Sequence, residues 1–126
     1  MSLREHTLPK EERLSGKTRI TALMRSGRYV NASCLRCCFL PREEEGPGRI
    51  VVSVPKRLFK RAVKRNLLKR RIRESYRLQK QMLPCGVDLM FVYTSHEVQP
   101  FTEIYAAVGN LLSQIAAKTA QDHGEV

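Results

Sequence analysis

The chain has 126 residues, a mass of 14.5 kDa, a formal net charge of +11 and a pI near 10. A chain of this length with 42% apolar residues fills one hydrophobic core, and two domains are excluded. No apolar run approaches the roughly 18 residues of a membrane span, and the N-terminus lacks the apolar stretch of a signal peptide. We expect one cytoplasmic domain over 1–126, flexible at about 1–8 and 119–126, with no membrane partner.

The N-terminal half predicts one helix followed by an antiparallel pair of strands. Apolar residues recur three and four positions apart over 17–26, and Gly27 occupies the position of a helix C-terminal glycine. Alternating and β-branched residues predict strands at 33–40 and 50–54, joined by a charged turn. A further short strand would fit within 28–50.

The C-terminal half begins with the longest predicted element. Pro55 ends the second strand, and a basic helix of about 25 residues, roughly 37 Å long, follows it to about residue 81. A buried strand at 87–93 and an amphipathic helix at 100–118 complete the coarse order α-β-β-α-β-α.

The excess positive charge is confined to one segment. Between Lys56 and Lys80 lie twelve basic residues and one acid, whereas the rest of the chain carries eleven of each sign. A solvated helix face normally alternates in sign. The segment therefore predicts a polyanionic partner, and its length suits the phosphates of a folded nucleic acid.

Residues for catalysis or metal binding are not evident. The carboxylates at 43–45 fit a solvated loop, Asp88 fits a polar position on the solvent face of a strand, and no phosphate-binding glycine loop or metal motif is present. Cys34 and Cys37 have CxxC spacing, but residues three apart on a strand face opposite sides. Buried reduced thiols are favoured over a zinc- or thiol-dependent enzyme for the four cysteines, Cys34, Cys37, Cys38 and Cys85.

Within the basic segment, arginines are the strongest candidates for RNA contacts, because the planar guanidinium donates two parallel hydrogen bonds to phosphate. These arginines are Arg65, Arg70, Arg73 and Arg77. Asn66 has poor helix propensity, which leaves it open to contact a base, a 2′-hydroxyl or a backbone group.

Aromatic residues on the strands allow two interpretations. Phe39, Phe91 and Tyr93 could form a floor on which unpaired bases stack, or they could belong to the core. Core is favoured for Phe91, which shares its parity with apolar neighbours in a buried strand. For Phe39 and Tyr29 the two interpretations remain open.

Two motifs resemble the signature of the bacterial ribonuclease P protein subunit: VPKR at 54–57 and AVKRNLLKRRIRE at 62–74. The segment LPKEERL at 8–14 and the later Gly27 are similar to the N-terminal pattern of that family. The resemblance extends from residue 8 to about 115.

The resemblance implies an α+β fold, a two-layer α/β sandwich like that of certain ribosomal proteins, with a central sheet and a left-handed βαβ crossover through the basic helix. It implies an accessory subunit in which the ribonuclease P RNA and its Mg²⁺ ions cleave the 5′ leader from precursor tRNA. The chain itself would carry no catalytic residue, metal or small-molecule substrate, and would bind the RNA and the leader.

The family motif maps the RNA contacts onto this chain. With the neighbouring cations, the expected RNA-binding residues are Lys56, Arg57, Lys60, Arg61, Lys64, Arg65, Asn66, Lys69, Arg70, Arg73 and Arg77. The expected groove for the leader is formed by Ile20, Met24, Leu35, Cys38 and Phe39.

Departures from the family pattern at four positions affect these expectations. Leu67 stands where the family repeats arginine, a loss that Arg71 would offset, and Pro55 replaces a serine. Ile20 and Met24 replace aromatic residues, which predicts weaker base stacking. The alternative function is that of a ribosome-associated or general RNA-binding protein.

Overall fold

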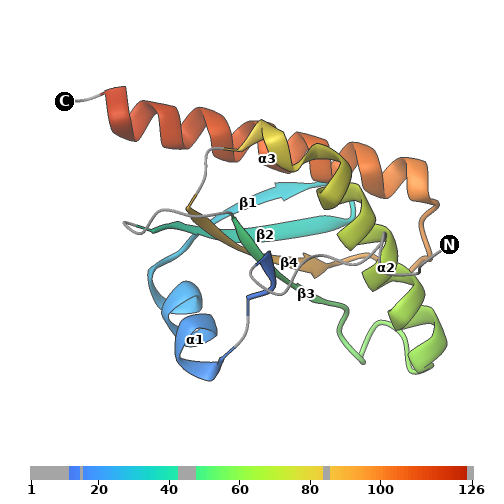
Figure 1. Ribbon diagram of the computed structural model, residues 1–126. Coiled ribbons are helices and arrows are strands. Elements are labelled where there is room, and N and C mark those ends of the chain that lie inside the picture. The colour runs from blue at the N-terminus through green and yellow to red at the C-terminus, as the bar shows by residue number, and fades with distance from the viewer. Residues whose placement is uncertain (1–11, 15, 43–47, 84–85, 125–126) are drawn as a thin grey trace, which may run out of the picture.

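The computed structural model describes residues 12–14, 16–42, 48–83 and 86–124, with side chains up to residue 120 (Figure 1). The elements in chain order are α1 (Lys17–Ser26), β1 (Arg28–Ala32), β2 (Leu35–Pro41), β3 (Arg49–Ser53), α2 (Ala62–Gln79), the 3-10 turn η3 (Lys80–Met82), β4 (Val87–Tyr93) and α3 (Phe101–Gly124). This mixed composition confirms the predicted α+β class.

The four strands form one sheet in the order β1-β2-β4-β3. Strand β4 pairs antiparallel with β2 and parallel with β3, and β1 pairs antiparallel with β2. The predicted antiparallel pair of 33–40 with 50–54 is therefore wrong, because β4 lies between these strands. β4 is apolar on both faces, which favours the middle of a sheet. β1 is the further short strand that the sequence allowed within 28–50.

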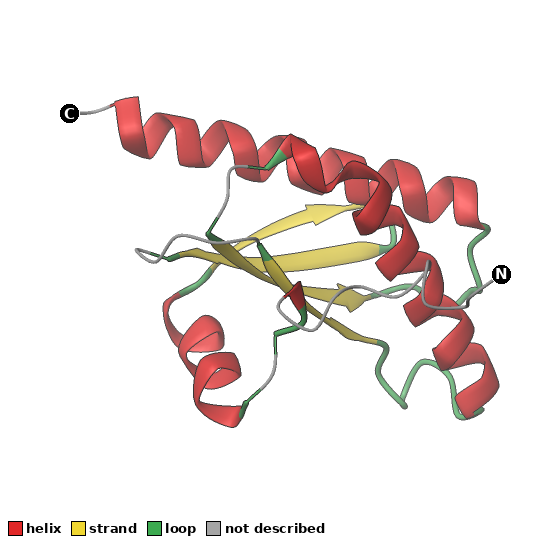
Figure 2. Cartoon of the chain, in the orientation of Figure 1, coloured by secondary structure: helices red, strands yellow, loops and turns green. Residues whose placement is uncertain are grey.

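The two faces of the sheet are covered unequally (Figures 1 and 2). Helices α2 and α3 pack against one face and enclose the main core, as in the predicted two-layer arrangement. Helix α1 packs on the opposite face over a small cluster of Leu14, Leu23 and Cys38. The main core includes Leu35, Phe39, Leu89, Phe91, Leu68, Ile72, Tyr76, Val108 and Leu111.

Helix α2 is shorter than predicted. It begins at Ala62, and its 18 residues span about 27 Å. The preceding residues form a turn in which the amides of Leu58 and Phe59 donate to the carbonyl of Pro55. Phe59 is buried, with its ring centroid 5.9 Å from that of Tyr93. Burying Phe59 in this core requires the chain to turn before the helix begins.

Helix α3 is longer than predicted. It continues to Gly124, beyond the predicted end near Lys118. Its inward side is fully buried at Ile104, Val108 and Ile115. Neither α3 nor any other helix in the described part of the chain is long and apolar enough to cross a membrane.

The three cysteines in the described ranges are free and buried. Cys34 lies in the turn before β2 and joins the same core cluster as Cys37, so the expectation that they face opposite sides is wrong. Burial raises the pKa of all three thiols and keeps them protonated. No three metal-ligating side chains come together within the described residues. Cys85 and the carboxylates at 43–45 lie outside them.

Gly27 ends α1 for a reason other than the left-handed backbone that usually selects glycine there. Its φ of −73° and ψ of 157° are open to any residue. A Cβ at this position would lie only 2.4 Å from the carbonyl oxygen of Leu23 and 2.5 Å from Sγ of Cys38. The close approach of α1 to β2 therefore requires glycine.

We expect Gly27→Ala to lower the free energy of unfolding by roughly 1 to 3 kcal/mol, the usual cost of overpacking against atoms that cannot move aside. Urea denaturation followed by circular dichroism measures this change. The exposed neighbouring substitution Ser26→Ala is the control and should stay within about 0.5 kcal/mol of wild type. Equal stability of the two variants would contradict the proposed packing constraint.

Candidate nucleic-acid interface

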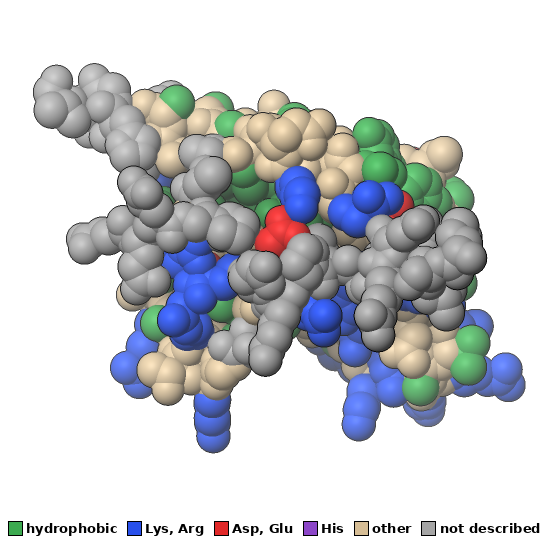
Figure 3. Space-filling view, viewed as in Figure 1, with side chains coloured by type: hydrophobic (Ala, Val, Ile, Leu, Met, Phe, Trp, Pro, Cys, Tyr) green, Lys and Arg blue, Asp and Glu red, His purple; other side chains and the backbone are tan. Residues whose placement is uncertain are grey.

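Most of the predicted RNA-binding residues lie on the surface. Figure 3 shows Lys and Arg side chains gathered along the lower side of the molecule, around α1 and the N-terminal end of α2. The exposed members of the predicted set are Lys56, Arg57, Lys60, Arg61, Lys64, Asn66, Arg70 and Arg73. Arg65, Lys69 and Arg77 are only partly exposed. Lys56, Arg57, Lys60 and Arg61 precede α2. The sequence predicted that they lie on the helix.

The segment 54–61, which we call the basic loop, is held by apolar residues at its ends. Val54 and Phe59 are 5% and 7% exposed, so the loop is fixed to the core at two points. Between and beyond these anchors, Lys56, Arg57 and Lys60 project into solvent. The core thus presents cations on a loop of defined path.

Arg65 has a structural role that the sequence did not indicate. Its Nη1 atom donates to the carbonyl oxygens of both Phe59 and Lys60, each at 2.8 Å. The guanidinium therefore clasps the basic loop from the first turn of α2. This use of the fork competes with the bidentate phosphate contact predicted for Arg65.

Helix α2 divides into a buried face and a cationic face. Leu68, Ile72 and Tyr76 pack into the core, whereas Arg70 and Arg73 are exposed. Partial burial and the neighbouring charge of Arg13 lower the pKa of Arg73. Like charges brought together in this way favour an anion beside them.

Asn66 lies on the exposed side of α2, beside these arginines. Its side chain makes no hydrogen bond to another described residue. The predicted alternative of a contact between Asn66 and a neighbouring backbone group is therefore not seen in the described part of the chain. The side-chain amide is available to a ligand.

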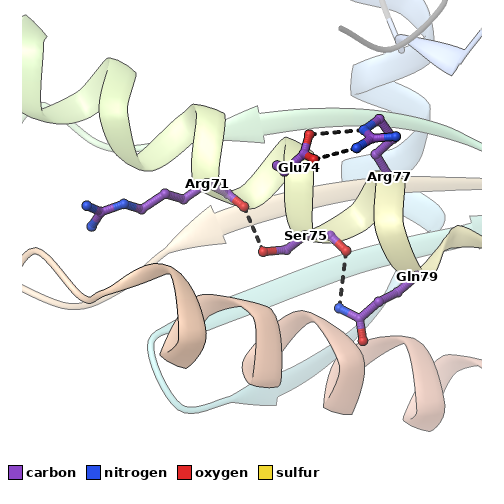
Figure 4. Close-up of polar contacts among 5 residues, drawn as sticks. All are labelled: Arg71, Glu74, Ser75, Arg77 and Gln79. Atoms are coloured by element: carbon purple, nitrogen blue, oxygen red, sulfur yellow. Dashed lines mark hydrogen bonds and ion pairs between the residues drawn. The ribbon is translucent and has the colours of Figure 1, made fainter. Parts of the chain in front are cut away.

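Two arginines of α2 are committed to partners within the protein. Arg77 donates to both carboxylate oxygens of Glu74, on the side of the helix away from α3 (Figure 4). This contact raises the pKa of Arg77. Arg71 donates to the carbonyl of Gln99 at 2.6 Å. Arg71 therefore points toward the segment before α3, and this contact competes with the predicted offset of Leu67 at the RNA surface.

Buried polar groups set the orientation of α2 against α3. Gln79 donates to the backbone carbonyl of Ser75 at 3.1 Å and to that of Tyr105 on α3 at 3.0 Å. Figure 4 shows Gln79 directed toward α3, opposite to Glu74 and Arg77. A buried amide that loses such partners costs about 1 to 3 kcal/mol, so the rotation of α2 is well defined.

Acidic side chains near the cations are neutralised inside the protein. Asp88 is 6% exposed, and its Oδ1 lies 3.2 Å from both Arg42 and Arg49. Glu12 is buried and pairs with Lys80 at 2.6 Å. Asp88 was expected at a solvent-facing position, but it is buried because both arginines lie against it.

Three of the five residues predicted to form the leader groove are buried. Leu35 and Phe39 are 1% and 0% exposed and belong to the core beneath α2 and α3, so they cannot line a surface groove. Cys38 faces the α1 side, but it is fully buried and donates to the carbonyl of Leu23. Ile20 is partly exposed and Met24 is 54% exposed.

Phe91 and Tyr93 are likewise core residues, which excludes an aromatic floor built from them.

The accessible surface beside α1 is formed by other residues. Side chains alternate along a strand, so Tyr29, Arg36 and Val92 share the α1 side of the sheet. Tyr29 is 46% exposed, and the guanidinium of Arg36 lies 5.8 Å from the centre of its ring. We call Tyr29, Asn31, Arg36 and Val92 the open sheet face.

The sequence contains a signal for this side of the molecule that overall charge balance conceals. Residues 13–42 include seven Lys or Arg residues and no acid. The acids that balance these seven cations lie elsewhere in the chain. The net charge of all residues outside 56–80 is therefore zero, and this sum hides the second basic segment.

The fold and the cationic surface around α1 and the N-terminal end of α2 are typical of a small α+β nucleic-acid-binding protein. The family model for ribonuclease P matches residues 8–116. The ribonuclease P protein component of Porphyromonas gingivalis is 32% identical over 86% of each chain, and that of Chloroflexus aggregans is 31% identical over 90% of this chain and 84% of the relative.

Solved structures agree in fold. The ribonuclease P protein of Staphylococcus aureus has a TM-score of 0.74 at 21% identity, covering 84% of this chain and 96% of that chain. That of Thermotoga maritima has a TM-score of 0.72 at 22% identity, with coverage of 82% and 96%. The chain belongs to the ribonuclease P protein family, whose members are the protein subunits of the endoribonuclease that matures the 5′ end of tRNA. Its partner is the ribonuclease P RNA.

Arg65→Ala and Arg70→Ala should weaken RNA binding in different ways. In the free protein, Arg65→Ala should accelerate amide hydrogen exchange at Leu58 and Phe59, because the clasp on the basic loop is lost. Arg70→Ala should leave that exchange unchanged. It should flatten the dependence of log K on log salt by roughly 0.7 to 0.9, the value for one lost phosphate contact.

Exchange rates by NMR and RNA affinity at several salt concentrations separate these roles. Lys118→Ala on α3 is the control for removal of an exposed cation. Unaltered exchange in Arg65→Ala would disprove the clasp, and an unaltered salt slope in Arg70→Ala would remove it from the interface.

Proposed function

We propose that the basic loop and the cationic face of α2 bind the RNA subunit, and that the 5′ leader of precursor tRNA crosses the open sheet face beside α1. The single observation that carries this proposal is the separation of charge. The cations of 56–73 are largely exposed, whereas Asp88 and Glu12 are buried and paired. Such a surface attracts phosphates without a competing acid.

The leader part of the proposal is supported by the chemistry of the open sheet face. An unpaired strand offers bases for stacking and phosphates for ion pairing. Tyr29 supplies an exposed ring and Arg36 a cation on the same surface, while Met24 supplies apolar contact from α1. One exposed aromatic residue fits the expectation that stacking contributes less here than in relatives with aromatic side chains on the first helix.

Cleavage chemistry is assigned in this proposal to the RNA subunit and its Mg²⁺ ions. The protein contributes fixed cations that reduce repulsion between RNA strands, and so lowers the Mg²⁺ concentration that the holoenzyme needs. We place this activity in the cytoplasm, where free thiols such as those of Cys34, Cys37 and Cys38 stay reduced.

Cleavage of a precursor tRNA by a bacterial ribonuclease P RNA at limiting Mg²⁺, with and without the protein, tests the proposal. RNA alone should be nearly inactive, and the protein should restore accurate 5′ cleavage. Arg70→Ala combined with Arg73→Ala should require a higher protein concentration for the same rate, whereas Lys118→Ala should not. Binding of the protein to the RNA without restored cleavage would refute the accessory function.

Tyr29→Ala should weaken holoenzyme binding to a precursor with a long leader by at least about fivefold, since base stacking on an aromatic ring contributes about 1 to 3 kcal/mol. Affinity for a substrate with a one-nucleotide leader should not change. Tyr105→Ala, a comparably exposed tyrosine on α3, is the matched control. Equal losses for both substrates would show that Tyr29 does not contact the leader.

A further inference from the structure

The outer side of α1 carries an open hollow of about 570 Å³. Its described lining comes from one stripe of the helix, opposite to the buried Leu23, and every lining residue is exposed. The lining residues are Lys17, Thr18, Thr21, Ala22, Arg25 and Ser26. None of them belongs to the basic loop, the cationic face of α2 or the open sheet face. We call this stripe the outer α1 face.

The cations in the first turn of α1 oppose helix stability. Lys17 and Arg19 lie in the first turn, which contains no acid, although the positive end of a helix dipole disfavours cations there. No ion pair joins Lys17, Arg19 or Arg25 to an acid among the described residues. Because the helix dipole does not favour Lys17 and Arg19 in the first turn, an external anion is the better explanation for their placement.

The chemistry of the outer α1 face suits a sugar-phosphate backbone. The hydroxyl groups of Thr18, Thr21 and Ser26 lie among the cations and can donate hydrogen bonds to phosphate oxygens. Lys17 and Arg25 are eight positions apart, or about 12 Å along the helix, which is long enough to contact more than one phosphate. None of the described lining residues is an aromatic residue on which a base could stack.

This face is distinct from the path of the leader. Leu23 turns the opposite side of α1 toward the sheet. Met24, which borders the leader surface, lies seven positions after Lys17 and so follows the same edge of the helix, whereas Thr18, Ala22 and Arg25 lie farther round, away from that edge. A helix is about 10 Å across, so an RNA strand on the outer α1 face is not the strand that lies on the sheet.

We propose that the outer α1 face is a second docking surface for the backbone of the ribonuclease P RNA, on the far side of the leader from α2. This inference rests on the proposed function. It adds that the RNA subunit is held from two sides of the leader, by α1 as well as by the basic loop and α2. The RNA subunit is the established polyanionic partner, and a large folded RNA can reach both surfaces.

Lys17→Glu is the most informative variant. A glutamate in the first turn is favoured by the helix dipole, so this change should leave α1 at least as stable as in wild type. A loss of RNA affinity therefore cannot come from unfolding, which a thermal melt checks directly. Arg25→Gln is the second variant, and Lys118→Glu, with the same charge reversal on α3, is the matched control.

Affinity for the ribonuclease P RNA without substrate is measured for the protein at several salt concentrations. Lys17→Glu should weaken binding about tenfold or more at low salt, and Lys17→Glu with Arg25→Gln should flatten the salt slope by roughly 0.7 to 0.9 per lost contact. The control should bind like wild type. Backbone cleavage from a probe attached to Arg25→Cys should map to one region of the RNA, apart from that reached from Arg70→Cys.

The outcomes distinguish this inference from the proposed function. If wild type binds and Arg70→Ala weakens binding, but Lys17→Glu does not, the outer α1 face is not a docking surface and the proposed function stands. If Lys17→Glu changes only the affinity of the holoenzyme for precursor tRNA, the face belongs to the substrate and the inference is overturned. If wild type does not bind the RNA, the proposed function itself fails.

Discussion

The position of β4 in the middle of the sheet is the constraint on which the rest of the structure depends. Its hydrogen bonds to β2 and β3 fix both neighbours, and its buried residues join the main core. Because β3 and β4 are parallel, the chain between them must form a crossover connection over one face of the sheet. Helix α2 is part of that connection. Burial of Leu68, Ile72 and Tyr76 then leaves Arg70 and Arg73 in solvent.

Three acids of the described residues pair with cations of the same chain. Asp88 and Glu12 are buried against arginine or lysine, and Glu74 is held by Arg77. Buried ion pairs contribute little net stability, since desolvation offsets their attraction. Their effect here is on the surface, where these three carboxylates are not free to pair with the exposed cations of the basic loop and α2. A polyanion can therefore bind those cations.

Individual arginines illustrate why a motif does not define an interface. Arg65, Arg70, Arg71 and Arg77 lie within 13 residues and are equivalent by composition. In the structure, Arg65 clasps the basic loop, Arg71 binds the carbonyl of Gln99 and Arg77 binds Glu74, while Arg70 is exposed. Helical rotation and the path of the adjoining loops decide these roles, and neither can be read from spacing alone.

The sequence by itself determined the α+β class, the bounds of α1 and β4, the basic segment and the family, because these depend on local periodicity, charge and short motifs. Only the tertiary structure decided the partners of β3, the start of α2 and the burial of Leu35, Phe39 and Asp88. It also brought the cations of α1 and α2 to one side of the molecule (Figure 3). Strand order and the choice of buried face depend on contacts between residues distant in the chain, which local patterns do not specify.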